Sequence, residues 1–261
     1  MKILFTSSEV APFAKTGGLA DVAGALPKAL QALGHDVRVV MPAYKSVKAG
    51  EPLPRALAVS LNGTSRKCNL NRTTLPDSNV PVYLIDYKKY YDRDELYQAK
   101  GVDYPDNAER FAFYSLAALE MVKQQDWSPD IIHCNDWQTA LIPAYLNTRY
   151  KEDSFFNKTA TVFTIHNLAY QGLARPDKIT HIGLDPMYYS PDYLEFYGKL
   201  NLMKSGLLFS DIINTVSKRY SKEMQTPEFG CGLEGILAQR KEDVFGIING
   251  LDYDTWDPQS D

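Results

Sequence analysis

The regular alternation of apolar runs with helical segments constrains the fold of this chain more than any other feature. Apolar or β-branched runs that end in turn residues occur at 2–7, 36–44, 80–87, 130–135, 159–167, 211–217 and 244–250. Segments with helical spacing of their apolar residues lie at 19–33, 106–124, 137–150 and 200–209. Strands that are apolar on both faces and alternate with helices are typical of a parallel sheet covered on both sides. The sequence therefore predicts an α/β fold with a doubly wound, mostly parallel sheet.

Two segments depart from this alternation. Residues 45–79 contain turns and some alternation but no strong period, and they predict a β-rich excursion. Residues 88–106 are polar and rich in tyrosine, which predicts a long functional loop. Because no internal repeat or low-complexity tract separates the segments, one domain is the simplest prediction.

The composition excludes several classes of protein. The chain has 261 residues, of which 44% are hydrophobic, and this is enough to bury a sizeable core. A net charge of −4 disfavours a nucleic-acid or membrane surface, so an anionic ligand must be held by a local pocket. Three widely spaced cysteines, Cys68, Cys134 and Cys231, support neither a disulfide framework nor a zinc site. Since no signal peptide or membrane span is recognisable, we expect a cytoplasmic protein.

Polar side chains follow four of the predicted strands. These clusters are residues 15–18, 135–137, 166–167 and 249–250. The carboxyl ends of parallel strands meet at one edge of a sheet, and ligands of such folds bind at that edge. We therefore expect the four clusters to contribute to one site.

The first cluster has the composition of a phosphate-binding loop. Gly17 and Gly18 allow a ligand to approach the backbone, and the helix that begins near residue 19 offers free N–H groups. Lys15 adds a positive charge, and Asp21 lies in the first turn of the helix. A phosphate-binding loop and a purely structural turn both remain possible at this point. A tight turn with a surface lysine has the same pattern, and an acidic residue such as Asp21 interacts favourably with the helix dipole in either case.

The next two clusters contain side chains that suit a sugar. Asp136 could bind sugar hydroxyls and Trp137 could offer a ring face for stacking, although Asp136 could equally cap the helix that follows. His166 and Asn167 could bind a hydroxyl or a developing phosphate charge, although a lone histidine is more often structural. No motif of a metalloprotease, a serine hydrolase or a P-loop occurs, and metal dependence is not indicated.

Six longer segments occur together in the order and spacing of a known family. They are "KTGGLADV", "NDWQTALIPAYL", "FTIHNLAYQG", "EFYGKLNLMKSGLLFSD", "TVSKRYSKEMQTPEFGCGLEGIL" and "INGLDYDTWDP". The chain closely resembles the amino-terminal half of bacterial glycogen synthases and plant starch synthases. This resemblance implies a GT-B glycosyltransferase, in which two Rossmann-like domains face each other across a cleft. Members transfer glucose from ADP-glucose to the non-reducing end of an α-1,4-glucan, with retention of configuration and without a metal or other cofactor.

The resemblance also implies roles for individual residues. Residues matching the family's site for the donor diphosphate and nucleotide are Lys15, Gly17, Gly18, Asp21 and Asn249. Residues matching its glucosyl and acceptor site are Asp136, Trp137, His166, Asn167 and Tyr97. His166 would steady the glucosyl group and Asp136 would orient its hydroxyls. In the mechanism that the resemblance implies, the acceptor 4-hydroxyl attacks from the side that the phosphate leaves, and the departing diphosphate takes the proton.

The resemblance covers only the amino-terminal part of such an enzyme. Residues 1–261 would form the acceptor-side domain, and the nucleotide-binding domain of the carboxyl-terminal half would be needed for activity. Two other functions remain open, namely a non-catalytic glucan-binding module and the same enzyme with UDP-glucose as donor. A plastid location would require a transit peptide that has been removed, and otherwise the expected location is the cytoplasm.

Overall fold

The computed structural model describes residues 1–48 and 50–250. Within these residues, ten strands form the main sheet, and seven of them run parallel. The parallel strands are β1 (Lys2–Thr6), β2 (Asp36–Pro42), β6 (Pro81–Asp86), β9 (Ile131–Asn135), β10 (Ala160–Ile165), β14 (Ile212–Thr215) and β15 (Val244–Gly246). Their order across the sheet is β15-β14-β10-β9-β1-β2-β6. The predicted α/β class with a mostly parallel sheet is confirmed.

The chain builds the sheet outward from β1, first toward one side and then toward the other. From β1 the chain adds β2 and β6 on one side, and then β9, β10, β14 and β15 on the other side. The reversal between β1 and β9 is a topological switch point, where the loops after neighbouring strands diverge and leave a crevice. The loop after β1 and the residues after β9 therefore meet at the position where such folds bind ligands.

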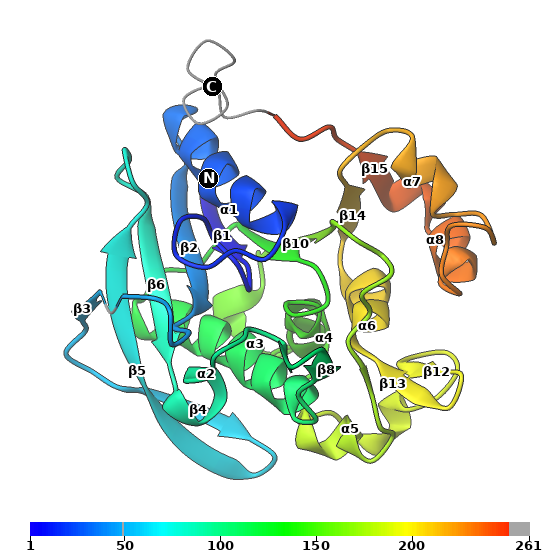
Figure 1. Ribbon diagram of the computed structural model, residues 1–261, viewed down its shortest axis with the longest axis horizontal. Coiled ribbons are helices and arrows are strands. Elements are labelled where there is room, and N and C mark those ends of the chain that lie inside the picture. The colour runs from blue at the N-terminus through cyan, green and yellow to red at the C-terminus, as the bar shows by residue number, and fades with distance from the viewer. Residues whose placement is uncertain (49, 251–261) are drawn as a thin grey trace.

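Helices cover both faces of this sheet (Figure 1). They are α1 (Gly18–Ala32), α3 (Asn107–Gln124), α4 (Leu141–Asn147) and α6 (Leu202–Phe209). On one face α3 packs against α4 and α4 against α6, and Gly206 of α6 lies so close to the ring of Phe163 that a Cβ atom there would clash. The neighbouring β10 residues Val162 and Thr164 point to the opposite face, which carries α1. The doubly wound arrangement is thus present in the structure.

Four predicted segments show how closely the pattern located the elements. The helix predicted at 106–124 is α3, and Gly34, with φ of +87°, ends the first helix as predicted. The helix predicted at 137–150 is wrong in its first turn, because α4 begins at Leu141 after a turn in which Asp136 has a φ of +55°. The strand predicted at 244–250 ends at Gly246, and the four residues beyond it are irregular.

The two irregular segments also have defined structures. The excursion at 45–79 is β-rich, as predicted, because β3 (Glu51–Pro52), β4 (Leu57–Leu61) and β5 (Thr64–Thr74) extend the sheet in antiparallel fashion beyond β6. The segment at 88–106 contains α2 (Lys88–Tyr91) and the hairpin of β7 (Gln98–Ala99) and β8 (Val102–Asp103). The excursion lies on the side of the sheet away from β15 (Figure 1). The segment at 88–106 reaches the loop after β1 through the hydrogen bond between Tyr97 and Glu9.

Smaller elements complete the described chain. A separate three-stranded sheet contains β11 (Leu173–Ala174), β13 (Lys199–Asn201) and β12 (Glu195–Phe196). The short helices are α5 (Lys178–His181), α7 (Tyr220–Glu223) and α8 (Glu234–Gln239), and 3₁₀ turns occur at Ser154–Phe156, Pro186–Tyr188 and Lys241–Asp243. None of the helices in the described residues is long and apolar enough to cross a membrane.

Candidate active site

A buried carboxylate shapes the loop that follows β1. Glu9 is 4% exposed, and its Oε2 accepts hydrogen bonds from the backbone N–H groups of Thr16 and Gly17. Its Oε1 accepts from the Thr16 hydroxyl at 2.6 Å and from the Tyr97 hydroxyl at 2.7 Å. Glu9 was not among the predicted site residues, although an acidic residue just after a strand of such a sheet was a usable signal. It fixes the path of the loop and ties it to the segment that carries Tyr97.

Gly17 and Gly18 stand at the exposed start of α1. Neither has a positive φ, and a Cβ atom at either position would meet no heavy atom within 4 Å. Neither glycine is therefore required by a left-handed turn or by packing against the rest of the described chain. The N–H groups of Gly18 and Leu19, in the first turn of α1, have no hydrogen-bond partner among the described residues. Open space in front of a helix N-terminus suits an anion that approaches the backbone.

Lys15 and Asp21 form an ion pair at the start of α1. The Lys15 Nζ lies 2.6 Å from Oδ1 of Asp21, and the two side chains are 47% and 37% exposed. Solvent screens such a pair, so its contribution to folding is at most about 1 kcal/mol. The structure thus brings Lys15, Gly17, Gly18 and Asp21 together as predicted, and their role in binding a diphosphate stays a prediction.

Asp136 joins the loops that follow β9 and β10. Its Oδ1 accepts a hydrogen bond from the backbone N–H of His166 at 2.8 Å, and the backbone N–H of Asn167 also points to the carboxylate. Burial is the main influence on this group and raises the pKa of Asp136 from 3.8 to about 7, against the opposing effect of the two N–H donors. The alternative that Asp136 caps the following helix is wrong, because α4 begins at Leu141, where no side chain caps it.

His166 is held as a neutral imidazole at the same place. Burial lowers its pKa to about 4, so the ring carries no charge at pH 7. Its Nε2 lies 2.9 Å from Oδ1 of Asn135, the last residue of β9. Asn167 beside it is exposed, and its Oδ1 accepts a hydrogen bond from the Ala169 N–H. Asp136, His166 and Asn167 are therefore adjacent, as predicted, and their contacts with a sugar stay predictions.

Trp137 is a core residue in this structure. It is 7% exposed, and its ring packs edge-to-face on Phe111 with centroids 4.9 Å apart. Gly172 lies against the ring so closely that a Cβ atom there would come within 2.4 Å of it. The expectation that Trp137 offers an exposed face for sugar stacking is therefore wrong. Its pattern in the sequence did not distinguish the two cases, because an aromatic residue after a strand fits either.

Tyr97 reaches the site from the loop between β6 and α3. Its hydroxyl donates to Glu9 Oε1 and lies 2.7 Å from Oγ of Ser8, and its backbone carbonyl accepts from Asn107. The completely buried guanidinium of Arg110 donates to the carbonyl of Leu96 and holds the same stretch in place. Tyr97 is thus close to the β1 loop, with its hydroxyl already bonded, and its contact with an acceptor stays a prediction.

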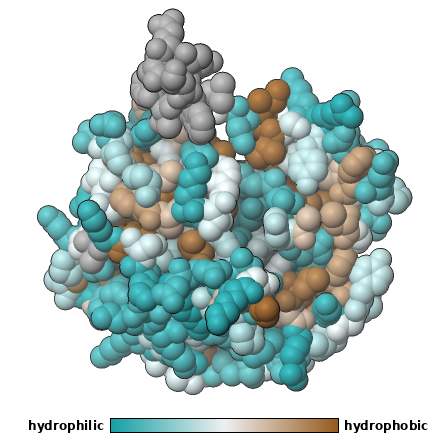
Figure 2. Space-filling model, viewed as in Figure 1, coloured by the Kyte–Doolittle hydropathy of each residue, from teal (hydrophilic) through white to brown (hydrophobic). Residues whose placement is uncertain are grey.

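A groove opens beside the β1 loop, on the face of the sheet that carries α1. Its volume is about 1650 Å³, its floor is formed by side chains of β9, β10 and β14, and its walls are α1 and the segment after β15. Gly18, Asp21 and Asn249 all line it, so Asn249 shares this groove with the start of α1. Figure 2 shows the surface hollowed in this region. A nucleotide contact of Asn249 stays a prediction.

The thiols and other metal-ligating groups do not form a cluster. Among the described residues, no three His, Cys, Asp or Glu side chains are placed to hold one metal ion. The cysteines are free thiols, and burial raises the pKa of both Cys68 and Cys134 to about 12. These two are therefore protonated at neutral pH and serve as core residues.

The strand order, the switch point and the polar loops around it define a Rossmann-like, ligand-binding α/β domain. Comparison with known proteins gives a narrower result. The chain belongs to the family of the starch synthase catalytic domain, whose sequence model matches residues 2–239.

Curated relatives and a solved structure agree with this assignment. The chain is 51% identical to a glycogen synthase of Geotalea uraniireducens and 45% identical to one of Thermotoga maritima, in each case over its whole length. It covers 54% of each of these proteins, so it spans about half the length of the curated relatives it matches. It also superposes on the catalytic domain of starch synthase IV from Arabidopsis thaliana, bound to ADP and acarbose, with a TM-score of 0.89 and 33% identity. That match covers 98% of this chain and 53% of the plant chain.

Proposed function

We propose that residues 1–261 form the amino-terminal, acceptor-side domain of a retaining glucan synthase. The enzyme would transfer glucose from ADP-glucose to the non-reducing end of an α-1,4-glucan such as glycogen or starch. The observation that carries this proposal is the placement of the Lys15–Gly18 loop and the Asp136–His166 pair after the carboxyl ends of the adjacent parallel strands β1, β9 and β10, in a chain of the starch synthase family. The ADP and acarbose bound to the similar plant catalytic domain support a nucleotide-linked donor and a carbohydrate acceptor.

In this proposal the protein acts chiefly by positioning and by stabilising charge. The open N–H groups of α1 and the ammonium of Lys15 would hold the diphosphate of the donor. The Asp136 carboxylate would orient hydroxyls of the transferred glucose, while the neutral ring of His166 steadies the same group. The acceptor 4-hydroxyl attacks the anomeric carbon from the face that the phosphate leaves, and the diphosphate takes its proton. Such catalysis depends on preorganised donors rather than on a protein nucleophile.

The proposed enzyme needs a carboxyl-terminal domain that completes the site. The groove between α1 and the segment after β15 supports this proposal, because its floor is a face of the parallel sheet over β9, β10 and β14. Phe245, Ile247 and Ile248 at its edge are 47%, 63% and 70% exposed. Parallel sheets are normally covered on both faces, so an open sheet face with an exposed apolar edge favours a further part of the protein as its cover.

Three finer properties belong to the same proposal. The reaction is proposed to need no metal, ADP-glucose is proposed as the donor in preference to UDP-glucose, and the proposed location is the cytoplasm. The bacterial glycogen synthases among the relatives support the location. The donor base would be bound outside the described residues, so ADP-glucose and UDP-glucose must be compared on the complete two-domain protein.

The decisive experiment measures glucose incorporation into glycogen by the complete protein. Radiolabelled ADP-glucose and UDP-glucose are supplied in parallel, with and without EDTA, and the linkage of the product is determined. We expect incorporation from ADP-glucose, insensitivity to EDTA and digestion of the product by an enzyme specific for α-1,4 bonds. An absence of incorporation from either donor would overturn the proposed function, and equal use of both would overturn the donor preference.

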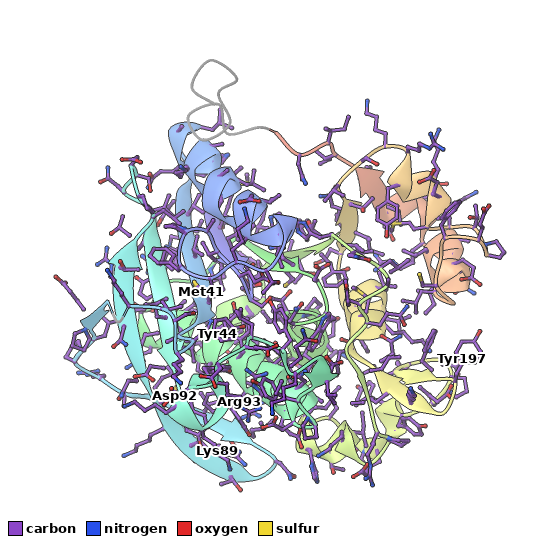
Figure 3. All side chains as sticks on the ribbon, viewed as in Figure 1. Met41, Tyr44, Lys89, Asp92, Arg93 and Tyr197 are labelled. Atoms are coloured by element: carbon purple, nitrogen blue, oxygen red, sulfur yellow. The ribbon has the colours of Figure 1, made fainter. Side chains whose placement is uncertain are left out.

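A non-catalytic glucan-binding module is less well supported. That alternative relied on aromatic and amide groups near Trp137, Asn167 and residues 188–197, and Trp137 is buried. Tyr197 does remain 82% exposed and extends from the turn between β12 and β13 at the edge of the molecule (Figure 3). Titration of maltooligosaccharides by calorimetry separates the two functions, because a binding module would bind them at millimolar concentration without any donor.

Substituting Lys15 by alanine in the complete protein should weaken the transition state and leave the fold intact. Loss of the charge-assisted contact to the diphosphate should cost about 1.5–3 kcal/mol, or roughly 10- to 150-fold in kcat/KM for ADP-glucose. The free energy of unfolding should change by less than about 1 kcal/mol, because the pair with Asp21 is screened by solvent. Steady-state kinetics and urea unfolding measure the two quantities, and an unchanged kcat/KM would leave Lys15 as a surface residue only.

The substitution Gly18→Ala should separate stability from donor binding. The added methyl group meets no protein atom within 4 Å, and alanine favours a helix over glycine by up to about 1 kcal/mol. Stability should therefore stay the same or rise, while the methyl group obstructs the diphosphate and lowers the affinity for ADP-glucose roughly tenfold or more. Calorimetric titration and thermal unfolding test this, with Gly235→Ala, another helical glycine with open space around it, as the stability control. An unchanged affinity for ADP-glucose would contradict the proposal that the diphosphate lies close to the backbone of Gly18.

A further inference from the structure

Asn135 joins the carboxyl ends of the three central strands through one side chain. It is the last residue of β9 and is completely buried. Its Nδ2 donates to the carbonyl of Thr6 at 3.0 Å and lies 3.4 Å from the carbonyl of His133. Its Oδ1 lies 2.9 Å from Nε2 of His166. The amide therefore connects β1 and β9 to the residue that directly follows β10.

These contacts determine which way the amide of Asn135 faces. Backbone carbonyl oxygens can only accept hydrogen bonds, so the NH₂ group must be the end that points to Thr6 and His133. A flipped amide would place its oxygen against those carbonyl oxygens, with no proton between them. The amide oxygen therefore faces His166, and this assignment follows from the hydrogen-bond network rather than from atom type alone.

The orientation of the amide in turn determines the tautomer of His166. An amide oxygen is an acceptor, so Nε2 of His166 must carry the proton that joins the two groups. Because burial lowers the pKa of the ring to about 4, the ring is neutral at pH 7 and holds one proton only. Nδ1 is then unprotonated, and it makes no hydrogen bond within the described part of the chain. Its lone pair is available to a ligand.

We propose that Asn135 is a positioning residue that holds His166 in the Nε2–H tautomer and thereby leaves the Nδ1 lone pair to accept a hydrogen bond from a hydroxyl group of the bound sugar. The opposite tautomer would set the lone pair of Nε2 against the oxygen of Asn135. The sugar contact rests on the proposed function, whereas the tautomer rests on the geometry alone. Buried Asp136 fixes the backbone of His166 by its own hydrogen bond, so the ring is oriented from two sides.

Nuclear magnetic resonance of histidine labelled with nitrogen-15 reads the tautomer without any substrate. The chain has four histidines, and the signals of His166 are those that disappear in the His166→Gln variant. At pH 7 we expect a protonated Nε2 and an unprotonated Nδ1 in the unaltered 261-residue chain. In Asn135→Leu, which fills the same volume without an acceptor, the two tautomers should mix. In Asn135→Asp the carboxyl group should be protonated, because one of its oxygens faces the carbonyls of Thr6 and His133 and must donate to them. Its other oxygen remains an acceptor for His166, so the Nε2–H tautomer should persist.

A matched control comes from the next polar pair on the sheet. Thr164 lies 2.6 Å from Nε2 of His133, so Thr164→Val should alter the signals of His133 and leave those of His166 unchanged. Near-ultraviolet circular dichroism confirms that each variant is folded. A protonated Nδ1 in the unaltered chain would overturn the proposal even if no variant folds, and so would an unchanged tautomer in Asn135→Leu.

Kinetics of the complete protein test the consequence for a bound sugar. Asn135→Leu should lower kcat/KM for ADP-glucose roughly tenfold or more, and Asn135→Asp should restore part of the loss. An unchanged kcat/KM in Asn135→Leu would overturn the sugar contact. A complete protein without glucan synthase activity would overturn the proposed function, while the spectra would still decide the role of Asn135.

Discussion

Replacing Asp136 by asparagine should reduce the activity of the complete enzyme at least 100-fold and, above pH 7, make the folded protein more stable. Asparagine has the same shape, and its Oδ1 can still accept the N–H of His166, as Asp136 does now at 2.8 Å. The lost charge-assisted hydrogen bonds to sugar hydroxyls should cost about 3 kcal/mol of transition-state stabilisation. Activity and stability should therefore change in opposite directions.

The gain in stability follows from the pKa of the carboxyl group. Burial raises the pKa of Asp136 from 3.8 to about 7, so the folded protein binds this proton more tightly than the unfolded chain does. The stabilisation of the folded state by the protonated Asp136 is fully present below about pH 4 and is lost as the pH rises toward 7. The unfolding free energy changes with pH by at most about 1.4 kcal/mol per pH unit through this one group. Asparagine does not titrate, so the variant lacks this loss.

Urea unfolding of both proteins between pH 5 and pH 8 measures this effect. Burial lowers the pKa values of His133 and His166 to about 3 and about 4, and these groups have the opposite sign, because their contribution is lost as the pH falls below about 6.5. Both histidines are present in the unaltered protein and in the variant, so their contributions cancel in the difference between the two unfolding free energies. We expect the difference in unfolding free energy to move in favour of the variant up to about pH 7. A difference that is constant with pH would contradict a raised pKa, and full activity would remove Asp136 from the site.

The architecture was predictable because its signals are local. Strands such as 2–7 and 130–135 contain apolar residues at consecutive positions, so both of their faces carry apolar side chains, and a sheet covered on both faces buries such strands. Glycine at position 34 marked the end of α1, since the left-handed backbone there, with φ of +87°, favours glycine. The meeting of 15–18 with 135–137 then followed from the rule that ligands bind at the carboxyl ends of parallel strands.

The details of the site depended on contacts between distant segments, which a sequence pattern does not show. Glu9 acquires its role from Tyr97, which lies 88 positions away in the chain. The burial of Trp137 depends on Phe111 and Gly172, which belong to other segments. Asp136 binds the N–H of His166 instead of capping a helix, because its positive φ turns the chain toward β10. The local pattern thus predicted the elements and the positions of the candidate residues. It did not predict which distant residues those candidates contact.

The 261-residue chain alone should show less than about one thousandth of the transferase activity of the complete protein. A departing diphosphate carries two or more negative charges, and the loop proposed to hold it contributes one ammonium group, that of Lys15, which also contacts Asp21. Loss of a single preorganised donor costs roughly 100- to 1000-fold in rate. Groups of a second domain that also bind the diphosphate should therefore each contribute a factor of this size to the rate.

Assays of the chain alone, of the complete protein and of the chain mixed with a separately expressed carboxyl-terminal domain test this expectation. We expect incorporation of glucose by the complete protein, none above background by the chain alone, and partial recovery in the mixture. Recovery is expected because the groove has an apolar edge, where Ile247 and Ile248 are 63% and 70% exposed, and this edge gives the second domain a surface to cover. The substitution Ile248→Glu should weaken that recovery and leave the fold of the chain unchanged, since the side chain is on the surface. Robust turnover by the chain alone would show instead that the loop and the Asp136–His166 pair suffice, and would contradict the shared site.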